Sequence, residues 1–197
     1  MKPSLLLRPT LLALMLASAG QAGAEEPRFF LGIGAGNVNY GFDSELCSTQ
    51  LGANCEIDNQ DRGLKLFAGA YITPTLMVEA SMYDFGALQG TVPSMGVTVT
   101  EEQTAFAAAL GGILPLSEHF ALTAKAGVFS TVLESTASGP GGTITISDDA
   151  RNLMLGGGVR LNASANVGLR VEYEFFNAAG DSETDISMAT ASVVVAF

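Results

Sequence analysis

The chain has 197 residues and a formal net charge of −11 at pH 7, with 23 glycines and no tryptophan. This length leaves room for about one domain, and the acidity argues against nucleic-acid binding, which relies on basic patches. Because no later segment is long and uniformly apolar, we expect no membrane-spanning helix after the first residues.

Residues 1–24 have the pattern of a cleaved signal peptide. Lys2 and Arg8 make the first residues basic, and an apolar run follows over residues 11–17. The small residues "AGA" end the segment at Ala24. The apolar run is too short to span a bilayer as a helix. We therefore predict a signal peptide over residues 1–24 and an exported domain over residues 25–197.

The exported region contains eight apolar or alternating segments. Their approximate ranges are 29–40, 62–72, 76–87, 102–114, 120–133, 151–161, 167–177 and 186–197. Short connections alternate with long ones, which cover about 41–61, 88–101, 134–150 and 178–185. This alternation indicates up-and-down hairpins with tight turns at one end and long loops at the other, as in outer-membrane barrels. The alanine-rich stretch 104–110 leaves a short helix open as an alternative.

Several segments place two kinds of side chain on opposite faces. In segment 167–177 the odd positions begin Val, Leu, Val, Tyr, Phe, and the even positions Gly, Arg, Glu, Glu. The polar faces hold mostly small residues and few charges, which suits a crowded interior better than a solvated surface. We therefore predict an all-β fold, an eight-stranded antiparallel up-and-down transmembrane β-barrel with its apolar face toward lipid. Segment 62–72 is apolar on both faces, and its assignment stays open.

Charged residues on the inward faces would meet in a narrow lumen. They are Glu79, Lys125, Arg160, Arg170, Glu172 and Glu174. An eight-stranded barrel is just wide enough for side chains to fill, and an unpaired buried charge costs several kcal/mol. We therefore predict an ion-pair network that closes the lumen. The alternative is a gate whose pairs rearrange to admit small solutes.

Aromatic residues lie near the segment ends, where the interfacial girdles of a membrane barrel are expected. Toward the turn end they are Phe29, Phe30, Tyr71, Phe120 and Phe197. Toward the long loops they are Tyr40, Phe42, Tyr83, Phe85, Phe106, Phe129, Tyr173 and Phe175. We interpret both groups as girdle residues.

The stretch "KLFAGAYITPTLMVEASMYDFG" (residues 65–86) resembles a hairpin typical of OmpA/OmpX-type small outer-membrane barrels. Residues 29–40 resemble the glycine-rich first strand of that family, and Phe197 resembles its C-terminal membrane-insertion signal, read by the insertion machinery. The resemblance implies an outer-membrane location, contact with lipid and lipopolysaccharide, and an interior Glu/Lys/Arg network. We expect a monomer without the peptidoglycan-binding domain of full-length OmpA-type proteins.

Cys47 and Cys55 lie in a polar stretch of the first long connection. Export to an oxidising compartment favours a disulfide between them, whereas a zinc site would lack a nearby histidine and the usual spacing. We expect no metal ion and no cofactor. His119 and Ser117 share a predicted periplasmic turn without a third partner, so we expect no enzyme. A lipid A-modifying enzyme is the remote alternative.

The expected role is envelope structure, or surface interaction and adhesion, through acidic extracellular loops. A small-solute channel is the alternative function. The loop acids could bind divalent cations that bridge to lipopolysaccharide, or form only a hydrated rim. Residues 137–150 could extend a hairpin above the membrane and offer a strand edge to a surface partner.

Overall fold

The computed structural model describes residues 29–41, 56–58, 60–92, 97–139, 142–179 and 184–197. Within these ranges the strands are β1 (Phe29–Tyr40), β2 (Glu56–Asp58), β3 (Gln60–Thr73), β4 (Leu76–Val92), β5 (Val97–Pro115), β6 (Phe120–Gly139), β7 (Gly142–Asn162), β8 (Val167–Ala179) and β9 (Thr184–Ala196). The part of the chain that is described contains no helix able to cross a membrane.

Eight antiparallel strands close a barrel, as predicted, and the short β2 is added beside β4. The order around the wall is β4, β3, β1, β9, β8, β7, β6 and β5, and β5 pairs with β4 again. The first and last strands meet along a ladder in which the N–H of Phe29 donates to the carbonyl of Phe197 at 3.0 Å. The reciprocal bond measures 2.9 Å. The strand with the terminal phenylalanine therefore closes the barrel.

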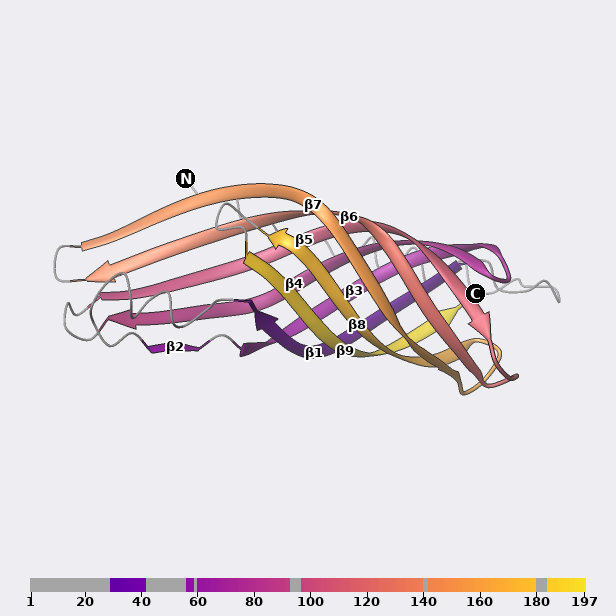
Figure 1. Ribbon diagram of the computed structural model, residues 1–197. Helices are drawn as coiled ribbons and strands as arrows, with labels where there is room; N and C mark the ends of the chain where they lie inside the picture. Colours follow the sequence, from indigo (N-terminus) through magenta and orange to yellow (C-terminus); the bar gives the residue numbers. More distant parts are fainter. Residues whose placement is uncertain (1–28, 42–55, 59, 93–96, 140–141, 180–183) are drawn as a thin grey trace.

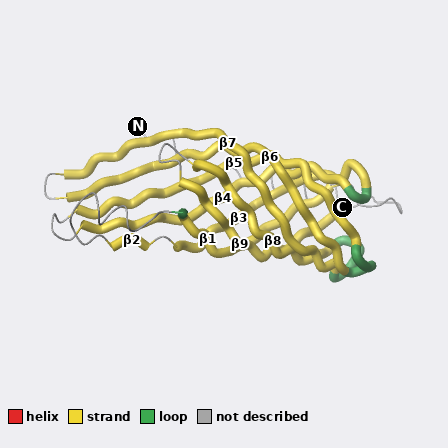
Figure 2. Tube along the Cα trace, viewed as in Figure 1, coloured by secondary structure: helices red, strands yellow, loops and turns green. Residues whose placement is uncertain are grey.

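Tight turns gather at one end of the barrel, which we call the turn end (Figure 2). The N–H of Leu116 donates to the carbonyl of Phe120 at 2.9 Å, and the N–H of Ala163 donates to the carbonyl of Val167 at the same distance. The opposite end is the loop end. This segregation is the one that the alternating connection lengths predict.

β4, β5, β6 and β7 project beyond the barrel at the loop end (Figure 1), and the β4–β5 ladder continues to Val92 and Val97. These four strands have 17, 19, 20 and 21 residues, whereas β1 has 12 and β8 and β9 have 13 each. The expectation of long loops over 88–101 and 134–150 is therefore wrong, because most of these residues are strand. Their Ser, Thr and Gly content is loop-like, but alternating Thr with Val or Ile favours strands.

A bulge marks the place where β4 leaves the barrel wall. The β4–β5 register shifts between Asp84 and Ala87, and Gly86 has a φ of 78°. The N–H of Ala87 donates to Oδ2 of Asp61 at 2.7 Å, which anchors the bulge to β3. A left-handed φ favours glycine, and a Cβ here would also crowd the Asp61 carboxylate.

Side chains alternate between the lumen and the outer surface along the barrel strands. The faces predicted for 76–87, 120–133, 151–161 and 167–177 are confirmed. Large apolar side chains exposed on the outer surface include Phe29, Ile33, Leu66, Val78, Phe106, Leu110, Val128, Leu155, Leu169, Val171, Tyr173 and Val193. A water-soluble monomer rarely exposes such a band, whereas hydrocarbon requires one.

The girdle interpretation is wrong for part of the aromatic set. The rings of Phe30, Tyr40, Tyr83, Phe85 and Phe129 are buried inside the barrel. They occupy inward positions of their strands, where they fill lumen space that small polar residues leave. Some aromatic residues therefore face lipid on the outer surface, and the others pack inside the lumen.

Candidate functional site: the lumen cluster

Six charged side chains meet in the middle of the lumen, and we call them the lumen cluster. They are Lys65 of β3, Glu79 of β4, Lys125 of β6, and Arg170, Glu172 and Glu174 of β8. All are buried. Three acids face three bases, so the formal charges of the lumen cluster balance.

Glu79 lies where all three bases of the lumen cluster converge. Its Oε1 is 2.7 Å from Nζ of Lys125 and 3.3 Å from Nζ of Lys65. Its Oε2 is 2.5 Å from Nη2 of Arg170. This carboxylate therefore ties β4 to β3, β6 and β8 across the barrel.

The two glutamates of β8 complete the lumen cluster. Nζ of Lys65 lies 2.7 Å from Glu172 and 2.9 Å from Glu174, and Nζ of Lys125 lies 2.5 Å from Glu174. Arg170 reaches Glu172 at 2.9 Å. Each buried charge thus has at least two partners of opposite sign, which offsets the desolvation that would otherwise oppose burial.

Five of the six charged residues expected in the lumen belong to this cluster, and Arg160 does not. Arg160 instead donates from Nη1 to the Tyr71 hydroxyl and from Nε to Oδ1 of Asn162 at 2.8 Å. It stands directly opposite Arg170 in the β7–β8 ladder. Like charges in such a pair repel, so the Arg160 side chain turns to the turn end.

Lys65 takes the sixth place, and the sequence reasoning missed it. Both faces of segment 62–72 are largely apolar, so alternation alone does not identify its inward face. The lysine itself is the signal that could have found it, because a lysine facing lipid in the middle of a strand costs about 2–4 kcal/mol. That cost favours the face that carries Lys65 and Phe67 as the inner one, as observed.

An aromatic layer closes the lumen on the loop-end side of the cluster. The ring of Phe176 packs edge-on against Tyr83, Phe85 and Phe129, with centroid distances of 4.9, 5.0 and 5.2 Å. The Tyr83 hydroxyl donates to Oε1 of Glu174 at 2.7 Å, which joins this layer to the lumen cluster. The residues packed in the layer are Val38, Tyr40, Tyr83, Phe85, Ala105, Ala107, Phe129, Met154, Phe176, Ile186 and Met188.

A second apolar layer fills the lumen on the turn-end side. Phe30, Phe67, Met77, Val194 and Ala196 form it. The Lys65 ammonium lies 4.6 Å from the Phe67 ring centroid, and the Arg170 guanidinium lies 4.2 Å from the same centroid. Cations near an aromatic face are stabilised, so the Phe67 ring stabilises Lys65 and Arg170 from the turn-end side of the lumen cluster.

The three carboxylates lie close enough to share a cation. Ligand atoms of Glu79, Glu172 and Glu174 all fall within 4.8 Å of one another. The ammonium and guanidinium groups of the cluster already supply three positive charges to them. The arrangement is therefore a balanced ion-pair plug, and its charge requires no metal ion.

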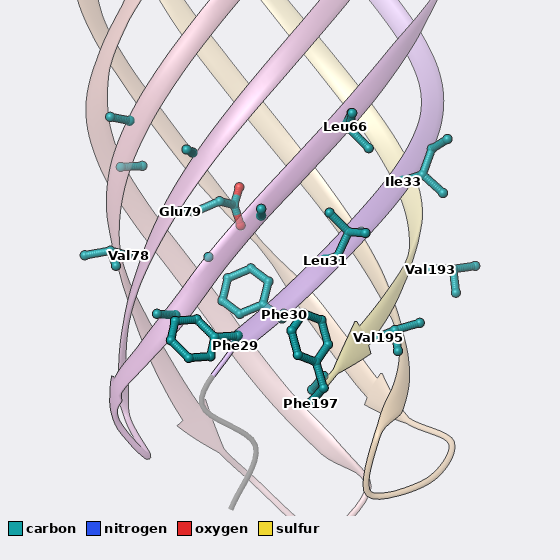
Figure 3. A pocket seen from close by; sticks show the side chains of 18 of the residues that line it. Phe29, Phe30, Leu31, Ile33, Leu66, Val78, Glu79, Val193, Val195 and Phe197 are labelled. Carbon is teal, nitrogen blue, oxygen red and sulfur yellow. The ribbon is translucent and has the colours of Figure 1, made fainter. Parts of the chain in front are cut away.

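An apolar hollow of about 1280 Å³ lies on the outside of the wall, beside the seam of β1 and β9 (Figure 3). Phe29, Ile33, Leu66 and Val78 stand around it, and alanines such as Ala80 line it between them. These are outward residues of their strands. Most of the lining thus belongs to the lipid-facing surface, and Phe30 and Glu79 of the barrel interior lie at its inner side.

The remaining expected site residues fall elsewhere. Cys47 and Cys55 lie outside the described residues, and Phe197 lies at the seam. Ser117 accepts the backbone N–H groups of His119 and Phe120 at 3.3 and 3.1 Å, which caps the turn. The Ser117 hydroxyl therefore stabilises the turn.

The sequence from residue 10 to residue 197 matches the family described as outer membrane protein beta-barrel domain. The chain belongs to this family. Its location is therefore the outer membrane of a Gram-negative envelope, with the turn end on the periplasmic side and the projecting strands outside. No match was found among curated protein sequences.

Several solved structures of outer-membrane proteins share this barrel fold. Ail of Yersinia pestis is 15% identical over 88% of this chain and 100% of its own, with a TM-score of 0.58. Neisserial surface protein A is 14% identical over 89% of this chain and 100% of its own, with a TM-score of 0.55. The N-terminal barrel of OprF from Pseudomonas aeruginosa is 11% identical over 85% of this chain and 97% of its own, with a TM-score of 0.53. At these identities the likeness concerns the fold alone.

Proposed function

We propose that this protein is a closed outer-membrane barrel that acts in envelope structure or in surface interaction through its extracellular strands. The single observation that carries the proposal is the filled lumen. Two apolar layers lie on either side of an ion cluster in which every charge has partners of opposite sign, and Tyr83 links that cluster to the aromatic layer on the loop-end side. Such packing leaves the projecting sheet as the part available to partners.

A small-solute channel is the competing function, and conductance separates the two. Purified protein in planar bilayers should give no stable openings. Stable, reproducible openings in the unmodified protein would refute the closed barrel. Glu174→Lys serves as a comparison, because reversing one charge places four bases against two acids and should loosen the plug.

The charge of the extracellular sheet restricts the partners that it can bind. Glu102 and Glu134 face each other across β5 and β6 on the outer face of the projecting sheet. Ail has also been solved with the heparin analogue sucrose octasulfate. A polyanion of that kind would be repelled by this acidic face, so we propose a neutral or basic partner for this chain.

We further propose how the chain is processed and inserted, and that it is not an enzyme. Removal of residues 1–24, a Cys47–Cys55 disulfide and insertion directed by Phe197 would give a monomeric, non-catalytic barrel. Mass spectrometry of the protein purified from outer membranes tests the cleavage and the disulfide together. Altered lipid A on overexpression, lost in His119→Ala, would contradict the non-catalytic role.

A further inference from the structure

Outward-facing side chains of β1, β3, β4 and β5 stand in rows across the barrel wall. Successive ladders place four of them side by side: Leu31, Ala68, Ala80 and Ala108. All four line the outer hollow beside the seam. Three neighbouring strands therefore contribute only a methyl group each along this row, which we call the floor row.

Two rows of larger side chains flank the floor row. On the loop-end side, Leu66, Met82 and Phe106 are register partners, and all three are exposed. On the turn-end side, Val78 and Leu110 are register partners, with exposed fractions of 40% and 53%. Figure 3 shows Leu66 and Val78 around the hollow. The floor row is therefore the bottom of a groove that crosses these strands.

The groove climbs away from the turn end as it crosses the wall. Leu31 is the third residue of β1 and Ala80 is the fifth residue of β4, each counted from the turn end. Ala108 is the eighth residue of β5 counted from the same end, and its register partner Val128 is the ninth residue of β6. Because the turn end faces the periplasm, the groove begins near the periplasmic surface of the bilayer and rises toward the bilayer centre.

The length of the groove corresponds to one leaflet of the membrane. From β1 through β3, β4 and β5 to β6 there are four strand spacings of about 4.8 Å, which give a path of about 19 Å. A row across strands tilted by about 35–45° is itself inclined, so this path climbs only about 12 Å. One leaflet contributes about 15 Å of hydrocarbon, half of a core of about 30 Å. The groove thus stays within the periplasmic leaflet, which holds phospholipid, whereas lipopolysaccharide occupies the opposite leaflet.

The periplasmic end of the groove has the polarity of a membrane interface. Asn166 lines the hollow there, and its Nδ2 donates to the carbonyl of Ala196 at 2.8 Å. Phe29 and Phe197 of the seam line the same end. Aromatic rings in such barrels gather at the level of the lipid headgroups. A headgroup beside Asn166 would therefore place its acyl chain at the entrance of the groove.

We propose that the groove binds one acyl chain of a phospholipid from the periplasmic leaflet, with the headgroup beside Asn166. The groove opens onto the lipid-facing surface, so its occupant comes from the bilayer. A chain in the groove contacts protein below and on both sides, whereas a chain on a smooth wall has protein on one side only. The additional contacts contribute dispersion energy and hold the bound chain more tightly than the surrounding lipid.

A second copy of this protein fits the groove less well than an acyl chain. Met82 and Phe106 stand out beside the floor row and would meet a convex neighbouring barrel first. The lipid site goes beyond the proposed function, because it depends neither on the lumen nor on the projecting sheet.

Native mass spectrometry tests whether a phospholipid is retained. Protein released from nanodiscs of palmitoyl-oleoyl phosphatidylglycerol should carry one lipid per chain. Ala108→Leu fills the floor row and should lower the retained fraction at least about fivefold. Ala189→Leu is the matched control, because Ala189 is exposed and is also the eighth residue of its strand from the turn end, but does not line the hollow. Equal retention by both variants would overturn the site, and so would release of the unmodified protein without lipid.

Phospholipids with a photoactivatable diazirine test the direction of the groove. A diazirine near the carboxyl end of the acyl chain should label β1 near Leu31, and one near the methyl end should label β5 and β6 near Ala108 and Val128. The labelled residues are identified by peptide mass spectrometry. The same labelling pattern for both lipids would overturn the inclined groove. Equal labelling of Leu169 on β8, on the far side of the barrel from β4, would overturn it as well.

Lipid A, added as a competitor, distinguishes lipids of the two leaflets. An excess of lipid A should leave the phospholipid bound, and displacement would overturn the assignment to the periplasmic leaflet. A mass of two chains without lipid would overturn the proposal in favour of a second copy. Heat-modifiable gel migration checks that each variant folds.

Discussion

Removing the charge of Lys65 should destabilise the barrel strongly. In Lys65→Met the side chain keeps most of its length, but Glu79, Glu172 and Glu174 each lose a partner, at 3.3, 2.7 and 2.9 Å. The lumen cluster then holds three acids and two bases. Breaking a buried pair by removing one partner costs about 3–5 kcal/mol, and we expect a loss within this range.

The assay for Lys65→Met is reversible urea unfolding in lipid vesicles, followed by gel migration and circular dichroism. Arg160→Met is the matched control, because it removes a lumen cation outside the cluster. Its loss should be smaller, since a single hydrogen bond with Tyr71 and one with Asn162 disappear. Adding Glu172→Gln to Lys65→Met should recover part of the stability by restoring charge balance. A Lys65→Met loss no larger than that of Arg160→Met would refute this account of the lumen cluster.

Three further predictions concern other layers of the molecule. Gly86→Ala should cost about 1 kcal/mol or more in the same unfolding assay, because the bulge needs a positive φ and a Cβ crowds Asp61; a neutral result would contradict the bulge geometry. Phe176→Ala should cost about 3–5 kcal/mol but leave the bilayer silent, since the lumen cluster still closes the barrel. Burial raises the pKa of the Glu101 carboxyl in the projecting sheet, although a hydrogen bond with Ser135 lowers it. Ionised Glu101 therefore weakens the sheet at neutral pH, so Glu101→Gln should slow amide exchange there at pH 7. This gain should vanish as the pH falls below the ordinary carboxyl value of 4.5, and a gain independent of pH would contradict the assignment.

The alternation of inward-facing and outward-facing side chains within one strand can be predicted from the sequence, because it depends only on neighbouring residues of that strand. This alternation predicts inward positions for Glu172 and Glu174, and both lie in the lumen cluster. Register between strands is not local, so the pairing of Arg160 with Arg170 was invisible. The side chain of Arg160 consequently turns to Tyr71, which no pattern in either strand indicates.

Strand length was the second feature that composition obscured. Residues such as Thr98 and Thr143 lie in stretches that read as loops because Ser, Thr, Gly and acids dominate them. In water above the membrane, an antiparallel sheet needs no apolar outer face, so the lipid-derived pattern stops while the strands continue. The hairpin expected over residues 137–150 does extend above the barrel, as β6 and β7 show (Figure 1).

The seam between β1 and β9 has a consequence for the time course of assembly. Phe29 and Phe197 bond to each other from nearly opposite ends of the described chain, so the largest loop in the molecule closes when they meet. Until then both border strands would expose unpaired backbone to hydrocarbon, which is strongly unfavourable. Folding should therefore be completed in a single late step that the last strand controls. Substitutions in β9 should slow insertion into vesicles more than equally destabilising substitutions in β6.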